Sequence, residues 1–275
     1  MTSRVTHRQS PASEPHSPRL VAWRGWLGAA LGFAFALTTG RAMPSPSADE
    51  LVQQGLTAES RFEPKQALLR FQAADELRPN DPFILQRISR QYSDATTLTT
   101  DPEEKRRLAE SALVFARRAY ELEPKNPVNV LSLAICYGKL GLYGGVEAKV
   151  QNARLIKKYA EEALALNPDY DWAHHVLGRW HYEVAELGGT KRLLVRMFFG
   201  GLPPASVQDA IRHLERAVEI APAAVGHRVE LGFAYQAAGR LAEARAEFSR
   251  CLTLPDQEIH DAPAKRRAQE ALARL

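Results

Sequence analysis

A short segment that ends in proline or just after it recurs along the chain, and it limits how the chain can fold. Each copy follows an alanine-rich amphipathic run. Because proline cannot continue a helix, each copy ends one helix and begins a connection to the next. The copies are Leu77-Arg78-Pro79-Asn80, Leu122-Glu123-Pro124-Lys125, Leu166-Asn167-Pro168-Asp169, Ile220-Ala221-Pro222-Ala223 and the degenerate Leu254-Pro255-Asp256.

The spacing of these copies indicates a repeat. Their first residues are separated by 45, 44, 54 and 34 residues, and 34 is the tetratricopeptide period. We therefore predict an all-α fold: a right-handed, tetratricopeptide-like helical solenoid of about five helix hairpins over residues 43–256. The charged, alanine-rich segment 257–275 is predicted to supply the polar C-terminal capping helix that such a stack needs.

Small residues within the units support this register. Gly55 and Ala67 stand where helix A and helix B of one hairpin approach closely, and Phe71 is suited to fill the space towards the next hairpin. Unit five repeats the pattern with Gly232, Ala244 and Phe248. We expect the extra residues of units two to four to lie between helix A and helix B, because a hairpin loop lengthens at small entropic cost.

The first 42 residues differ from the rest and are predicted to be a signal peptide or an N-terminal apolar anchor. A polar, arginine-containing stretch precedes the apolar run 26–37, and Gly40-Arg41-Ala42 resembles a signal-peptidase site. The run is shorter than the ~20 residues of a membrane span. We expect export to the periplasm or medium, with a mature chain that begins near Met43. A membrane-anchored or a cytoplasmic protein is the alternative.

Charge and motifs exclude several functions. The net charge of +4 arises in the leader, and the remaining 31 basic and 31 acidic residues balance. A neutral body has no general electrostatic footprint for nucleic acid. Nucleophile-elbow and phosphate-loop motifs are absent, so we expect neither an enzyme nor a cofactor. His174, His175 and His181 lack the i, i+4 spacing of a helical zinc site, so no metal is expected. Cys136 and Cys251 are expected to be buried thiols.

The fourth unit carries a longer signature. Residues 174–187 read HHVLGRWHYEVAEL, and Phe199 to Ala205 read FGGLPPA. This pattern resembles the regulator of microtubule dynamics family over roughly residues 47–275. The resemblance implies a non-enzymatic helical adaptor, associated in eukaryotes with microtubules and spindle poles or with organelle membranes. A secretory leader departs from that family, and an exported protein would not meet microtubules.

A ligand of such a solenoid is expected on the concave face formed by the A helices. The predicted partner-binding groove contains Arg90, Trp172, His175, Arg179, Tyr182 and Phe233. The two arginines suit a carboxylate or phosphate on a protein or peptide partner. Alternatively, Arg179 is tied to a neighbouring carboxylate, and the unit-four aromatic residues pack against the insertion 186–205.

Two further interpretations concern that insertion. Its segment 191–199 is basic and apolar, which suits a lid over the groove, a cover for a hairpin, or a helix that lies on a lipid membrane surface. If the insertion roofs the groove, the protein would be a carrier of a lipid-like or apolar small ligand rather than a protein-binding scaffold.

Overall fold

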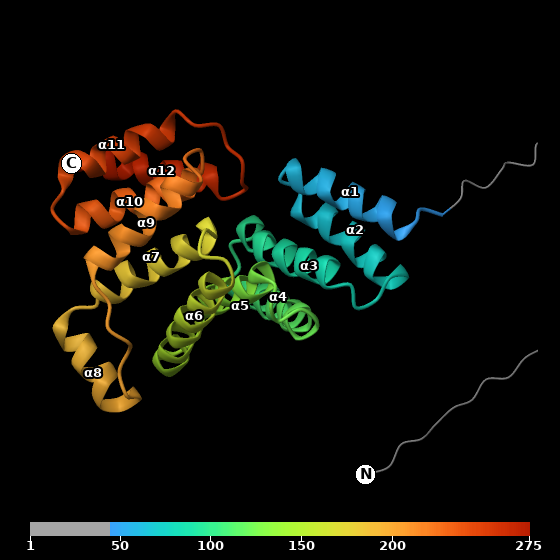
Figure 1. The fold of residues 1–275 in the computed structure, drawn as a ribbon, viewed down its shortest axis with the longest axis horizontal. Coiled ribbons are helices and arrows are strands. Elements are labelled where there is room, and N and C mark those ends of the chain that lie inside the picture. The colour runs from blue at the N-terminus through green and yellow to red at the C-terminus, as the bar shows by residue number, and fades with distance from the viewer. Residues whose placement is uncertain (1–44) are drawn as a thin grey trace, which may run out of the picture. The chain divides into compact units, whose positions relative to one another are not determined.

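The computed structural model describes residues 45–275, and the predicted leader lies outside the described residues. The described part is helical without strands, which confirms the predicted all-α solenoid (Figure 1). Its hairpins of helix A and helix B are α1 (Ala48–Ser60) with α2 (Pro64–Leu77), α3 (Pro82–Ala95) with α4 (Pro102–Leu122), α5 (Pro127–Gly141) with α6 (Val146–Leu166), α7 (Asp171–Ala185) with α9 (Val207–Ile220), and α10 (Val225–Ala237) with α11 (Leu241–Leu252). A short 3-10 turn, η1 (Thr96–Leu98), follows α3, α8 (Gly189–Phe199) separates α7 from α9, and α12 (Asp261–Leu272) ends the array.

The recurring proline segments lie between the units, as predicted. α2 ends at Leu77, and Pro79 stands in the turn before α3. There the side chain of Asp81 accepts hydrogen bonds from the backbone N–H groups of Phe83 and Ile84, at 2.9 and 3.2 Å. Asp81 is thus an N-cap that satisfies two donors the first helical turn leaves free. The side chain of Asn126 caps α5 in the same way after the second proline segment, whereas α7 and α10 begin without a side-chain cap.

The extra residues of units two and three are not in the loops where they were expected. α4 and α6 have 21 residues each, whereas α2 has 14, so most of the added length extends helix B. A longer helix satisfies its own backbone hydrogen bonds, which a longer loop leaves to water. In α4 the added turns also carry a surface ion-pair series, in which Arg106 contacts Glu103 and Glu110. Unit four differs, because its added residues include a separate helix, α8.

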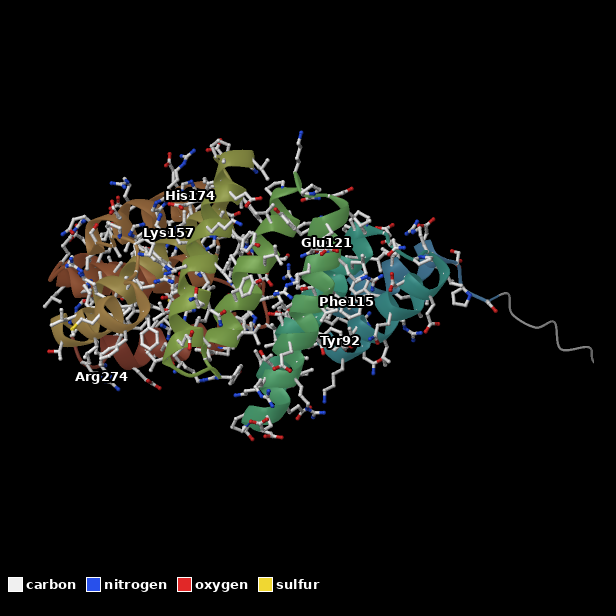
Figure 2. All side chains as sticks on the ribbon, turned by 90° about the horizontal axis from the view of Figure 1, so that it is seen from below. Tyr92, Phe115, Glu121, Lys157, His174 and Arg274 are labelled. Atoms are coloured by element: carbon white, nitrogen blue, oxygen red, sulfur yellow. The ribbon has the colours of Figure 1, made fainter. Side chains whose placement is uncertain are left out.

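Close helix contacts occur at the small residues that the repeat register indicated. Ala67, Ala217 and Ala244 have no exposed surface. A Cβ atom on Gly55 would lie 2.7 Å from the ring of Phe71, which is far inside van der Waals contact. Aromatic side chains of unit two also pack together: Tyr92 of α3 and Phe115 of α4 stack with ring centroids 5.7 Å apart (Figure 2). Both rings pack against the hydrophobic core of unit one.

Replacing Ala217 by leucine is expected to lower the free energy of unfolding by about 1–3 kcal/mol. Ala217 lies buried on α9, and three added carbons would force the neighbouring helices apart. Urea unfolding followed by circular dichroism measures the loss. Gln208→Leu, at an exposed position of the same helix, is the control. If both variants unfold at the wild-type midpoint, the assigned packing of α9 is wrong.

The two cysteines are buried and not bonded to each other. Burial raises the pKa of both thiols to about 11, so the thiolate is not the form present at neutral pH. Among the described residues, no helix is both long and apolar enough to span a membrane.

Candidate functional site

The A helices line one side of the stack. α3 packs against α5, α5 against α7, α7 against α10, and α10 against α12. The units follow one another along an arc, and these helices lie towards its inner side (Figure 1). We call the side chains they present there the inner face. It is where the sequence places the groove.

The middle of the inner face exposes apolar side chains. Phe83 of α3 is 44% exposed, Val128 and Ile135 of α5 are 39% and 37% exposed, and the guanidinium of Arg87 lies 5.0 Å from the centre of the Phe83 ring. These residues lie on the A helices α3 and α5, and none of them belongs to the predicted site. Apolar groups left open on adjacent helices offer a contact surface for the side chains of a partner.

Arg179 is the charged group of the predicted site that is most open to solvent. Its side chain is 48% exposed, and its Nε donates to Glu183 Oε1 at 2.7 Å, one turn along α7. A half-exposed ion pair of this type adds little stability. The predicted tie to a carboxylate is therefore present, yet the guanidinium keeps donors for a second acceptor.

A second cation stands near Arg179 on α5. Burial lowers the pKa of Lys139, although the carboxylate of Asp94 raises it, and the charge of Arg179 lowers it further. Lys139 Nζ donates to the Ser93 carbonyl at 2.9 Å and to Thr96 Oγ1 at 3.1 Å. Lys139 therefore joins α5 to the end of α3 and adds positive charge beside Arg179.

Trp172 and His175 belong to the junction between units four and five. Their rings are 5.0 Å apart, and both contact the ring of His227 on α10. His227 Nε2 lies 3.0 Å from an Asp171 oxygen, and its Nδ1 lies 3.1 Å from His175 Nδ1. Because a carboxylate only accepts, the ring of His227 donates to it from Nε2. Burial, and secondly the charge of His227, hold the pKa of His175 well below its usual range.

A second histidine pair joins α7 to α9. His174 Nε2 is 2.9 Å from the Pro168 carbonyl, and its Nδ1 is 3.0 Å from His213 Nδ1. Burial and the two neighbouring imidazoles, His174 and His181, lower the pKa of His213 to about 4. The contact between the His174 and His213 rings therefore joins α7 to α9. Within residues 45–275, no group of three His, Cys, Asp or Glu side chains is placed to hold a metal ion.

Tyr182 and Phe233 are partly covered by the C-terminal helix and its neighbours. Both pack against the hydrophobic core of unit five. Phe233 meets Phe248 edge to face, with ring centroids 5.0 Å apart, and the guanidinium of Arg267 from α12 lies 4.7 Å from its ring. Arg267 Nη1 also donates to Glu230 at 2.8 Å. α12 therefore covers part of the inner face of unit five.

Arg90 lies on α3, two turns after Phe83, and meets the connection between α11 and α12. Its guanidinium pairs with Glu59 at 3.3 Å, with Asp94 at 3.6 Å and with Glu258. His260 Nε2 lies 3.0 Å from Asp94 Oδ1. The connection 253–260, which we call the C-terminal bridge, thus crosses from α11 to α3 (Figure 1). Contacts between residues 168 positions apart leave no local sequence signal.

α8 does not cover the inner face. It packs against α6, which is a helix B, and Arg154 of α6 donates to the carbonyl oxygens of Phe199 and Gly201 at its end. The expectation that this insertion is a lid over the groove is therefore wrong. A hollow of about 430 Å³ lies elsewhere, between α1 and α2, and residues with polar side chains such as Gln53, Gln66 and Arg70 line it. It gives no support to a carrier of apolar ligands, which remains a prediction.

Comparison with known proteins identifies the family of this chain. The sequence profile of the family described as Regulator of microtubule dynamics protein 1-3 matches residues 46–275. The chain belongs to this family. Regulator of microtubule dynamics protein 1 of Bos taurus is 34% identical to it over 143 residues, which are 52% of this chain and 45% of the relative. Protein 3 of Xenopus laevis is 28% identical over 190 residues, 69% of this chain and 41% of the relative. The chain spans less than half the length of these regulator of microtubule dynamics proteins.

A solved structure agrees on the fold of this family member. A thermophilic tetratricopeptide-repeat protein of Thermus thermophilus superimposes with a TM-score of 0.60 at 20% identity, covering 82% of this chain and 100% of the other. At that identity the likeness concerns the fold alone. Together, the family match and the fold confirm the resemblance that the unit-four signature indicated.

Proposed function

We propose that the protein is a non-enzymatic scaffold that binds an extended peptide segment of a partner on the inner face. The observation that carries the proposal is the exposed row of Phe83, Val128 and Ile135 on adjacent A helices, together with the accessible guanidinium of Arg179. Apolar side chains of a peptide would contact the row, and an acidic side chain or terminal carboxylate would bind Arg179.

The C-terminal bridge supports this chemistry. It places the carboxylate of Glu258 on Arg90, and Ile259 lies beside Phe62 and Pro64 in a small pocket. A turn with an acidic residue followed by an aliphatic one therefore already rests at the edge of the inner face. A partner with the same order of side chains would find matching contacts along α5 and α7.

Arg179→Ala is expected to weaken such a peptide by roughly 1.5–3 kcal/mol, about 10–150-fold, because a charged hydrogen bond is lost. Peptides selected from a random display library on the wild-type protein serve as the probe, with affinities measured by fluorescence anisotropy. The melting temperature should change little, since the Glu183 pair is half exposed.

Arg212→Ala is the matched control. Arg212 also pairs with a carboxylate on its own helix, at 2.6 Å from Asp209, but it stands on α9, a helix B. Its replacement should leave peptide affinity unchanged. If Arg179→Ala lowers the melting temperature and leaves affinity intact, Arg179 is structural and its assignment to the site is wrong.

Regulation of microtubule dynamics is stated in the names of the relatives. For this chain we propose peptide binding alone. We also propose export, which the apolar run and the Gly40-Arg41-Ala42 site in the leader support. The partner would then be a periplasmic or secreted protein.

A further inference from the structure

α8 differs from every other helix in the described part of the chain, because none of its residues is buried. Four large apolar side chains are open to solvent: Leu193, Leu194, Met197 and Phe198, with exposed fractions between 48% and 69%. Exposing several large apolar groups together is costly in water, so a cluster of this size usually marks a contact surface.

The helical period places these four side chains together. With 3.6 residues per turn, residues 193, 194, 197 and 198 share one face. Val195 and Phe199, which are less exposed, fall on the opposite face. Lys191 and Arg196 fall at the two edges of the apolar face. α8 therefore presents an apolar strip bordered by a cation on each side.

The protein holds α8 firmly at the side of the stack. Arg192 Nη2 donates to the carbonyl oxygens of Val184 and Ala185, at 2.9 and 3.2 Å, which fixes the start of α8 to the end of α7. At the other end, Arg154 binds the carbonyl oxygens of Phe199 and Gly201. The helix projects beside α6, away from α12 (Figure 1). Its apolar strip is thus held outwards without a partner inside the described part of the chain.

The positive charge of α8 indicates which kind of surface would cover its apolar strip. Gly189–Phe199 contains Lys191, Arg192 and Arg196 and no acidic residue, whereas the chain beyond the leader is neutral. We propose that α8 lies on an anionic lipid membrane surface, with the four apolar side chains among the acyl chains and Lys191 and Arg196 at the lipid phosphates. A second copy of this chain would offer no excess of negative charge to these cations.

A dye at position 197 tests the proposal. In full-length protein carrying Met197→Cys, the environment-sensitive dye NBD reacts with the new thiol, because Cys136 and Cys251 are buried. With vesicles of phosphatidylcholine and phosphatidylglycerol at 7:3, we expect NBD emission to rise at least twofold and shift to the blue. Leu69→Cys, on the exposed side of α2, is the control and should change little. The dye reports on α8 even if the leader also binds vesicles.

Charge reversal tests the cations. Lys191→Glu with Arg196→Glu should weaken the vesicle-dependent signal at least tenfold, because each basic residue near an anionic surface adds to binding. Lys65→Glu with Arg70→Glu, also exposed, is the matched control and should retain it. The proposal is overturned if the label at position 197 ignores vesicles, if pure phosphatidylcholine gives the same signal, or if the signal rises with protein concentration in the absence of lipid.

Discussion

Phe248→Ala should destabilise the protein by about 3–5 kcal/mol, the largest effect we expect from a single substitution. Phe248 has no exposed surface and fills the core of unit five, against Gly232 and Phe233. The close approach at Gly232 leaves no side chain there to occupy the cavity that alanine would create. Urea unfolding followed by circular dichroism gives the change in free energy.

Phe198→Ala provides the matched control, because it removes the same side chain from a position that is 69% exposed. Its effect should stay within about 0.5 kcal/mol. An equally small effect of Phe248→Ala would contradict the packing of helix A against helix B in unit five.

Mild acid should also destabilise the fold, and this is the second large effect that we expect. His175, His181 and His213 have pKa values lowered first by burial, to about 4 for His213. In the unfolded chain these histidines take up protons near pH 6.5, whereas in the folded chain they take up protons only at a much lower pH. Stability is therefore complete above pH 6.5 and is lost as the pH falls towards 4. By pH 5 the loss from His213 alone should be on the order of 2 kcal/mol, and His175 and His181 add to it in the same direction.

Urea midpoints measured at pH 7.5, 6 and 5 follow this loss. The variant His213→Gln lacks one of these histidines. The difference between its urea midpoints at pH 7.5 and pH 5 should therefore be smaller than in the wild type, whatever its stability at pH 7.5. A wild-type midpoint that does not move over this range would show that the histidines at the α7–α9–α10 junction are free to ionise in the fold.

The fold was largely predictable because its signals are local and repeat. Pro79 and its equivalents mark the connections, and small residues such as Gly55 and Ala67 mark helix contacts within 20 residues of each other. The fate of the extra residues was less predictable. From the sequence, the segment that precedes Ala112 could lengthen either a loop or helix B. It lengthens the helix, because a helix satisfies its own backbone hydrogen bonds.

The candidate site was harder to predict than the fold. Helical spacing placed Arg179 on the inner face, where its ion pair with Glu183 follows from the i, i+4 rule. The same spacing could not reveal that His227 covers His175, or that Glu258 reaches Arg90. Those contacts depend on how much each unit rotates relative to the last, and small rotations add up over several units.

The C-terminal bridge changes how such an array should unfold. In an open stack each unit touches only its neighbours, so the terminal units fray independently. Here the pairs Arg90–Glu258 and Asp94–His260 join the second unit to the connection before the last helix. The C-terminal bridge cannot then leave the stack without breaking contacts on α3, and hydrogen exchange in α3 and α12 should slow or quicken together. A contact of this kind couples two units that are far apart in the sequence, which an open row of modules cannot do.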